Sequence, residues 1–250
     1  MTRPAVLITG GAKRIGAVLT RTFAAAGWHV VIHVKDSGPD AERLAATLPS
    51  AEVVTCDLTD PAAAAAMIKQ LAARLDDWRV LVNCAAVFNL DTAREIDHAT
   101  YVEAVTVNAE SPARMAQAFL AHARTNGGRR VINFLDQKLR NPNPDFFSYT
   151  MAKHGLAAAT TMLAMAQDRT EDRIYGLAPG AMMASFDQAP EEHEVSGRMN
   201  LLRRLTDPQE LADAALWLAQ GWLASGETLY IDSGQHLLAQ PRDVLYLARA

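Results

Sequence analysis

Short runs of apolar residues, many of them β-branched, recur along the chain and are separated by longer stretches that read as helices. The runs occupy residues 5–9, 29–33, 53–56, 80–83, 131–134, 174–178 and 228–231. Within each run the apolar residues are nearly continuous and do not alternate strictly with polar ones. That pattern is typical of strands buried on both faces of a parallel sheet.

The stretches between the runs predict helices over residues 14–26, 40–48, 61–75, 100–124, 148–167 and 207–220. Asp60-Pro61 and Asp207-Pro208 each place an N-cap residue before a proline suited to the first helical position. Strands alternating with helices predict an α/β fold, a single-domain Rossmann-type doubly wound sheet of about seven parallel strands over residues 1–250. Ligands of such sheets bind at the carboxyl ends of the strands.

Two segments stand outside this alternation. Residues 182–200 are irregular and rich in charge, and they contain Pro190 and Gly197. We expect this segment to be a substrate loop near the site. Residues 240–250 follow the last predicted strand as a C-terminal extension that could reach a neighbouring subunit.

Composition narrows the classes of function. Lys and Arg number 24 against 28 Asp and Glu, for a net charge of −4, and no basic block stands out. A nucleic-acid or membrane partner is therefore not expected. The apolar runs are far shorter than the ~20 residues of a membrane span, and no secretory leader pattern precedes the first run. We expect a cytoplasmic protein with Cys56 and Cys84 as buried, reduced thiols and with no metal site.

Glycines follow the first predicted strand, in the segment Thr9-Gly10-Gly11-Ala12-Lys13-Arg14-Ile15-Gly16. Gly10 and Gly16 would let the backbone of Lys13, Arg14 and Ile15 approach a pyrophosphate at the helix N-terminus. A tight turn that merely needs glycine is the alternative. The position after the first strand of an alternating pattern favours dinucleotide binding.

The end of the second predicted strand indicates which dinucleotide is bound. Sites that prefer NAD place a carboxylate there, whereas sites for NADP place cations. Here the acidic position falls on Val34, and His33, Lys35 and Ser37 could together hold a 2′-phosphate, with Asp36 facing solvent. Solvated turn residues are the alternative. The pattern predicts NADPH as the cofactor.

Tyr149 and Lys153 lie four residues apart, so they share one face of the predicted helix. Reduction of a carbonyl or imine needs a hydride from the cofactor and a proton from a positioned acid. A nearby ammonium lowers the pKa of a phenol, which would make Tyr149 a usable proton donor. Tyr-x-x-x-Lys alone occurs often by chance, but here it follows the fifth predicted strand.

These motifs together resemble the short-chain dehydrogenase/reductase family over essentially the whole chain. Further segments match family positions around the cofactor and the active site, and the matching residues are Asp57, Leu58, Asn83, Asn108, Pro179 and Gly180. The resemblance implies that Asp57 bonds the adenine amine, although a helix-approach cap is an equal alternative. It implies that Asn108 kinks a helix and holds a water that relays protons towards Lys153, which orients the nicotinamide ribose. It also implies a homotetramer.

Two positions depart from the common family pattern, and a third matches one branch of the family. Arg14 stands where most members have the middle glycine of the loop, and Asp136 where most have a catalytic serine. Phe88 lies five residues after Asn83. Pteridine reductases and dihydromonapterin reductases resemble this chain at Arg14 and Asp136, and pteridine reductases also resemble it at Phe88. The resemblance implies that Phe88 stacks on a pterin ring, which suits a flat heteroaromatic substrate.

The sequence therefore predicts an NADPH-dependent reductase that converts a 7,8-dihydropterin to the tetrahydro form. Asp136, Tyr149, Lys153 and Asn108 would be catalytic. Residues expected at the substrate are Arg14, Phe88, Asp136, Tyr149 and Met183. Two alternatives stay open. One is a carbonyl reductase acting on a non-pterin ketone, and the other is a catalytically silent dinucleotide-binding protein, against which the intact catalytic group argues.

Overall fold

Seven parallel strands form one sheet in the computed structural model, which describes residues 3–249. The strands are β1 (Ala5–Thr9), β2 (His29–Val34), β3 (Ala51–Thr55), β4 (Trp78–Asn83), β5 (Arg130–Phe134), β6 (Arg173–Pro179) and β7 (Thr228–Ile231). Their order across the sheet is β3-β2-β1-β4-β5-β6-β7, and every pairing is parallel. The predicted doubly wound, Rossmann-type sheet is confirmed.

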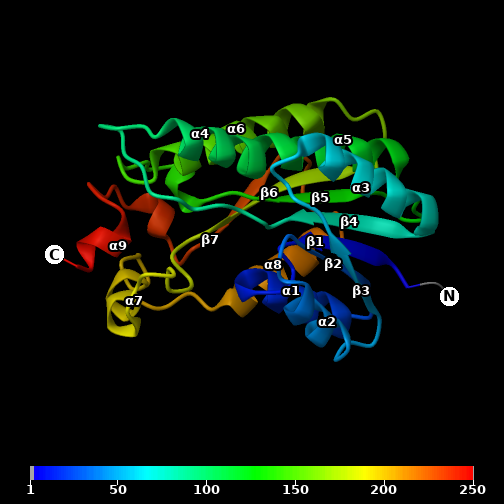
Figure 1. The fold of residues 1–250 in the computed structure, drawn as a ribbon, viewed down its shortest axis with the longest axis horizontal. Helices are drawn as coiled ribbons and strands as arrows, with labels where there is room; N and C mark the ends of the chain where they lie inside the picture. The colour runs from blue at the N-terminus through cyan, green and yellow to red at the C-terminus, as the bar shows by residue number, and fades with distance from the viewer. Residues whose placement is uncertain (1–2, 250) are drawn as a thin grey trace.

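Helices cover both faces of this sheet (Figure 1). One layer holds α1 (Arg14–Ala25), α2 (Gly38–Ala45) and α8 (Pro208–Leu218). The other holds α3 (Pro61–Arg74), α4 (His98–Val105), α5 (Ser111–His122) and α6 (Phe147–Met165). The predicted N-caps are confirmed, since Asp60 accepts from the backbone N–H of Ala62 and Asp207 from that of Gln209.

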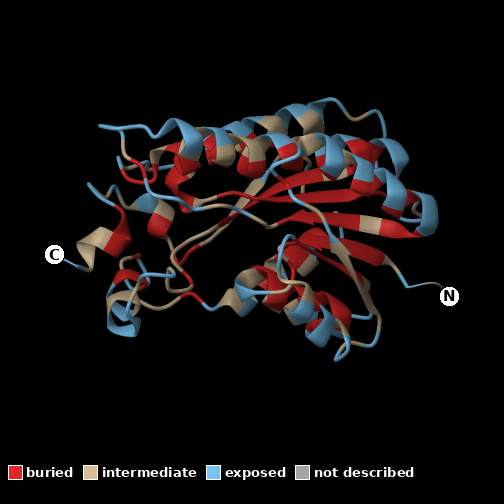
Figure 2. Cartoon of the chain, in the orientation of Figure 1, coloured by how far each residue is buried: buried red, intermediate tan, exposed pale blue. Residues whose placement is uncertain are grey.

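The central strands are buried from both sides, as Figure 2 shows. Val6 and Ile8 of β1 belong to the core beneath α1 and α8, whereas Leu7 belongs to the core beneath α3 and α5. Successive side chains of a strand point to opposite faces, so a strand between two helix layers must be apolar at every position. This is why the runs in the sequence are continuous.

The predicted helix over residues 100–124 is in fact two helices. Between α4 and α5 the chain makes a π-helical turn, Thr106–Glu110. Pro112 lies in the first turn of α5 and has no N–H to donate, and its ring would clash with the carbonyl group four residues earlier in a regular helix. The wider π turn removes that clash, and it places Asn108 at the kink that the family resemblance implied.

The two irregular segments are more ordered than expected. Residues 182–200 contain a short helix, α7 (Pro190–Ser196), which the sequence reading missed. Residues 240–249 contain α9 (Val244–Leu247), and Ala250 lies outside the described residues. Figure 1 shows α7 and α9 near each other at the end of the molecule where the C-terminus lies. Arg249 joins them through ion pairs with Glu192 and Asp187. The extension thus lies against its own chain.

Over residues 3–249, none of the helices is both long enough and apolar enough to cross a membrane.

Candidate active site

The loop between β1 and α1 forms a narrow cradle at the carboxyl edge of the sheet. Gly10 has a φ of 65°, a left-handed conformation that glycine adopts without strain. A Cβ on Gly16 would lie 2.1 Å from the carbonyl oxygen of Gly10, so this approach of helix to loop requires glycine. Within the described residues, Lys13 precedes α1 without making a side-chain cap hydrogen bond. The first N–H groups of α1 are thus available to an anion, and the cradle fits a dinucleotide pyrophosphate.

His33 lies beneath this cradle, opposite Thr9 in the parallel register. The N–H of Gly10 donates to its Nδ1 at 3.3 Å, and its Nε2 lies 3.0 Å from the carbonyl oxygen of Cys56. Burial lowers the pKa of the imidazole to about 4, so the ring is neutral at pH 7. The expectation that His33 helps to hold a 2′-phosphate is therefore wrong. It is buried and both ring nitrogens bond the protein, so it braces the loop instead.

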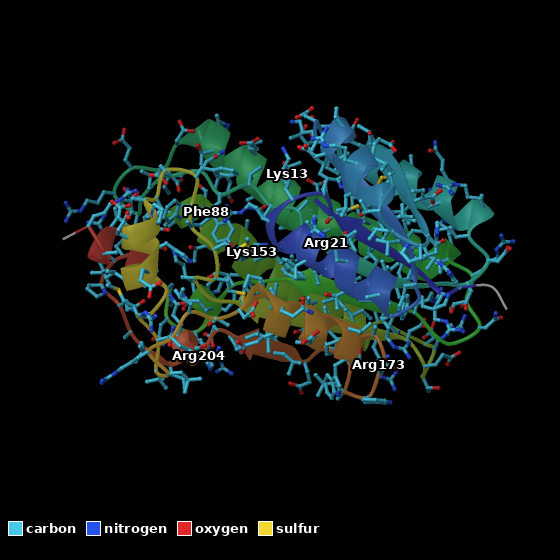
Figure 3. All side chains as sticks on the ribbon, turned by 90° about the horizontal axis from the view of Figure 1, so that it is seen from below. Lys13, Arg21, Phe88, Lys153, Arg173 and Arg204 are labelled. Carbon is cyan, nitrogen blue, oxygen red and sulfur yellow. The ribbon has the colours of Figure 1, made fainter. Side chains whose placement is uncertain are left out.

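Basic side chains line a cavity of about 420 Å³ beside the cradle. Lys13, Arg21 and Arg43 contribute them from the loop, α1 and α2. Lys13 forms an ion pair of 2.8 Å with Asp40, and this contact lowers the pKa of that carboxyl group. Figure 3 shows Lys13 and Arg21 on the same side of the molecule. The sequence reading missed Arg21 and Arg43, because only the fold brings α1 and α2 to one cavity.

A second exposed pair lies beyond the end of β2. Lys35 lies 3.0 Å from Asp57, which raises the pKa of the lysine. Asp57 also accepts from the backbone N–H of Thr59 at 2.9 Å, and these contacts lower the pKa of its carboxyl group. Leu58 is buried, and Ser37 immediately precedes α2. Asp57 therefore stabilises its own turn, and its contact with the adenine amine remains a prediction.

Tyr149 and Asp136 are hydrogen-bonded to each other at the carboxyl edge of the sheet. The hydroxyl of Tyr149 donates to Oδ2 of Asp136 at 2.8 Å. The other carboxylate oxygen accepts from the backbone N–H of Lys138 at 2.8 Å, so Asp136 is held from two sides. Lys153 is buried on the same helix as Tyr149, and its Nζ donates to the carbonyl oxygen of Phe134 at 2.6 Å. The structure thus brings together three of the four predicted catalytic residues.

The acid–base state of this group differs from the prediction. Burial, followed by the nearby carboxylate of Asp136, raises the pKa of Tyr149 well above its usual value. The expected lowering by Lys153 is wrong, because a phenolate would be a second buried anion beside Asp136. Burial lowers the pKa of Lys153 to about 8 and raises that of Asp136. Tyr149 is therefore a neutral hydrogen-bond donor to Asp136.

Two buried asparagines order the backbone around this group. The amide of Asn108 makes two hydrogen bonds of 2.9 Å with the backbone N–H and C=O of Val87. Its side chain therefore positions the loop after β4, and the implied water relay remains a prediction. Asn83 donates to Oδ1 of Asn133 at 2.8 Å across β4 and β5. Asn83 thus joins two strands beneath the proposed cofactor position.

The strand β6 ends at Pro179, and Gly180 follows it in a crowded turn. A Cβ on Gly180 would lie 2.6 Å from Oε1 of Gln235. That same oxygen accepts from the backbone N–H of Ala181 at 2.9 Å. The turn therefore requires glycine, and it directs the chain into the segment 182–200.

Aromatic rings form a wall beside Tyr149. Phe88 stacks on Phe146 with centroids 3.9 Å apart, and it lies edge-on to Tyr149 at 4.6 Å. Phe88 is still 42% exposed, so part of it is free to contact a ligand. The Nζ of Lys153, labelled with Phe88 in Figure 3, lies 5.6 Å from the centroid of the Tyr149 ring.

Arg14 links the phosphate loop to the segment 182–200. Its guanidinium donates to the carbonyl oxygen of Ala184 at 2.8 Å and lies 5.2 Å from the ring centroid of Phe186. Met183, next to Ala184, is half-buried against the core. The φ of Arg14 is 50°, which explains why glycine is common at this position in the family. Here the strained backbone carries a side chain that anchors the loop.

Asp91 is a site residue that sequence reasoning missed. Its carboxylate accepts from the N–H of Ser148 at 2.9 Å and from the hydroxyl of Ser148 at 2.5 Å. Its own carbonyl oxygen accepts from the N–H of Phe147. These bonds hold the start of α6, one residue before Tyr149. No local sequence motif predicts this contact, because Asp91 and Ser148 are 57 residues apart in the chain.

Residues 10–236 match the family model described as enoyl-(acyl carrier protein) reductase, and this match spans the cradle, the catalytic group and the turn after β7. The chain belongs to the short-chain dehydrogenase/reductase family. Among solved members, FolM alternative dihydrofolate reductase 1 from Brucella canis, complexed with NADP, is 30% identical, with a TM-score of 0.88 and 96% of each chain covered. The corresponding Brucella suis protein, in complex with NADP, is 31% identical, with a TM-score of 0.86 and coverage of 96% and 97%.

The family also includes more distant curated relatives of different specificity. The 7alpha-hydroxysteroid dehydrogenase of Escherichia coli K12 is 27% identical over 239 residues, which cover 91% of this chain and 92% of that one. Similarity at this level shows an oxidoreductase of the short-chain family, and the substrate must be argued from the site.

Because His33 is buried in its neutral form beneath the loop between β1 and α1, we expect the folded chain to lose stability at acid pH. Because the pKa of His33 is about 4 in the folded chain and near 6.5 in an unfolded one, its contribution to stability is complete above pH ~6.5 and is lost as the pH falls towards ~4. We expect the loss to be about 3 kcal/mol. Urea unfolding of the parent and of His33→Gln between pH 8 and pH 4 measures it. The two curves should converge as the pH falls, and parallel curves would show that His33 is not held neutral.

Proposed function

We propose that this chain is an NADPH-dependent reductase that converts a 7,8-dihydropterin to the tetrahydropterin. The observation that carries the proposal is the Asp136–Tyr149 hydrogen bond next to the exposed part of Phe88. A pterin is a flat ring with a polar amino-pyrimidine edge. An aromatic face and a neighbouring carboxylate–phenol pair match these two features.

Asp136 and Tyr149 would supply the proton of the reaction. NADPH, when bound, supplies the hydride to the imine carbon of the substrate. Protonated Asp136 passes its proton to the oxygen of Tyr149 as the tyrosine hydroxyl donates to the adjacent ring nitrogen. This relay avoids a phenolate, which the burial of Tyr149 disfavours. Because burial raises the pKa of Asp136, a larger protonated fraction is available near neutral pH.

The same pair would also hold the substrate edge in place. The amino group of a pterin is a donor that a carboxylate accepts, and buried polar groups left without partners penalise a substrate that lacks it. Phe88 covers one face of the ring. Arg14 and Met183 would border the opposite end, where Arg14 donates to the carbonyl oxygen of Ala184 in the segment 182–200.

The cofactor would lie over the cradle between β1 and α1. Similar Brucella structures are complexes with NADP, and the cavity lined by Lys13, Arg21 and Arg43 offers cations to a 2′-phosphate. Lys35 adds a further exposed cation, which is paired with Asp57 in this structure. The remaining proposed cofactor contacts are Gly10, Arg14, Ile15, Gly16, Ser37, Leu58, Asn83, Tyr149, Lys153, Pro179 and Gly180.

A ketone substrate is the second candidate. The similarity to a hydroxysteroid dehydrogenase favours it, since that name implies chemistry at an alcohol carbon. The carboxylate–phenol pair argues for the pterin, because a simple ketone has no donor to offer to Asp136. A cytoplasmic location and a homotetramer remain predictions.

NADPH oxidation by the purified chain tests the function. The substrates are dihydromonapterin, dihydrobiopterin and dihydrofolate, with a panel of cyclic and linear ketones beside them and NADH in parallel. We expect at least a tenfold higher kcat/KM with a dihydropterin than with any ketone, and a preference for NADPH over NADH. Oxidation that depends on a ketone alone would identify a carbonyl reductase. Cofactor binding without turnover on either class would identify a silent dinucleotide-binding protein.

Arg14 offers a sharper test of how the substrate loop is held. Arg14→Gly removes the bond to Ala184 and also relieves the left-handed backbone, which costs about 1–2 kcal/mol in a non-glycine residue. We expect thermal stability to be unchanged or higher, whereas KM for the dihydropterin rises about tenfold, equivalent to about 1.4 kcal/mol. Arg14→Lys, which keeps a cation but not the forked donor, is the matched control. An unchanged KM for Arg14→Gly would exclude this anchoring role.

A further inference from the structure

Lys138 is a buried cation close to the carboxylate of Asp136, and the proposed mechanism assigns it no role. It lies in the short 3-10 turn Gln137–Leu139 that follows Asp136, and it is only 3% exposed. Its Nζ lies 2.5 Å from Oδ2 of Asp243 and donates to the carbonyl oxygen of Asp145 at 3.4 Å. A buried ammonium is costly unless it is paired. Its partner is supplied by the C-terminal segment, more than 100 residues further along the chain.

Asp243 is itself firmly held. Its Oδ1 accepts from the N–H of Leu245 at 3.0 Å, which caps α9. Its own N–H donates to Oδ2 of Asp145 at 2.8 Å, and Arg242 forms an ion pair with Asp145 at 2.7 Å. Two cations and two carboxylates therefore interlock the turn after Asp136, the segment before α6 and the C-terminal segment. One carboxylate of this set, Asp145, precedes the aromatic wall by a single residue.

The C-terminal segment also reaches the catalytic tyrosine through apolar contacts. Leu245 packs in one buried cluster with Phe146 and Tyr149. The ring of Tyr246 stacks on Phe146 with centroids 6.1 Å apart, and Phe146 in turn stacks on Phe88. Phe146 immediately precedes α6 with a φ of 54°, and the rings of Phe88 and Tyr246 pack against its side chain. The C-terminal segment thus contacts Lys138 through Asp243 and the aromatic wall through Leu245 and Tyr246.

We propose that Lys138 and Asp243 are a paired positioning element for Asp136 and Tyr149, through which residues 240–249 complete the active site of their own chain. The inference rests on the role proposed for Asp136 in the reductase. Lys138 fixes the turn whose N–H holds Asp136, and Asp243 fixes Lys138. Neither residue contacts the reacting atoms, so both act through Asp136.

The two residues of the pair act on Asp136 with opposite sign. The groups that face Asp136 are Tyr149 and Lys153 from α6, Lys138 from its own turn and Asp243 from the C-terminal segment. The charge of Lys138 lowers the pKa of Asp136, and the charge of Asp243 raises it, while burial makes the largest contribution. Further out, Asp145 and Arg242 pair with each other. Cys84, from the segment after β4, is a neutral thiol because burial raises its pKa to about 12.

Because the charges of Lys138 and Asp243 shift the pKa of Asp136 in opposite directions, a test can distinguish this role from a purely structural one. Lys138→Met and Asp243→Asn break the same ion pair, but they remove charges of opposite sign. The carboxyl titration of Asp136 is followed by NMR of the chain labelled with ¹³C at aspartate and assigned with Asp136→Asn. This measurement needs no substrate, so it is independent of whether the pterin assay succeeds.

We expect the pKa of Asp136 to rise in Lys138→Met and to fall in Asp243→Asn, with Lys138→Arg close to the parent. Where dihydropterin is turned over, the alkaline limb of the kcat profile should move in the same directions. Arg249→Gln is the matched control, since it removes the ion pairs of the C-terminal segment with Asp187 and Glu192 without altering the charges near Asp136. Should Lys138→Met fail to fold, Asp243→Asn decides alone: a fall in the pKa of Asp136 supports the proposal, and a rise or no change overturns it. Shifts in one common direction, or none in either variant, would overturn the proposal.

Discussion

A phenol and a carboxylate meet at the carboxyl edge of this sheet, and the hydroxyl of Tyr149 donates to Asp136 at 2.8 Å. Both groups lie where burial opposes charge, so the pKa of each is raised. The contact requires Asp136 at the end of β5 and Tyr149 in the first turn of α6. The bond from the N–H of Ser148 to Asp91 holds the start of α6 before Tyr149, and the bond from the N–H of Lys138 holds Asp136.

Much of the fold could be predicted from the sequence because the strands of a buried parallel sheet appear as short, continuous apolar runs. Strands buried on both faces must be apolar throughout, and all seven runs correspond to strands. The proline after an aspartate marked two helix starts for an equally local reason. The site residues Tyr149, Lys153 and Asp136 could be found because their spacing, or their place after a strand, matches a family pattern. The helical pattern of residues 100–124 did not show the π turn at Thr106–Glu110, because the sequence has continuous helical character there; the kink at Asn108 was implied by the family resemblance alone.

The remaining parts of the site depend on contacts between distant segments. His33 reads as a surface cation at the end of a strand, yet the register with β1 buries it under the phosphate loop. The pKa of Tyr149 was mispredicted because the helix spacing shows the ammonium but hides the burial and the carboxylate. Lys138 and Asp243 carry no local signal, since their pairing exists only once residues 240–249 fold back on the site.

In the proposed mechanism, Asp136 is the residue that adapts a short-chain reductase to a pterin. The direct measurement is the kcat/KM of Asp136→Ser for a 7,8-dihydropterin against that of the parent, with NADPH affinity measured to confirm an intact cofactor site. We predict a loss of at least about 100-fold, the usual contribution of a positioned acid, with NADPH affinity retained. If Asp136→Ser reduces the dihydropterin as fast as the parent does, the carboxylate–phenol pair is not what the chemistry uses.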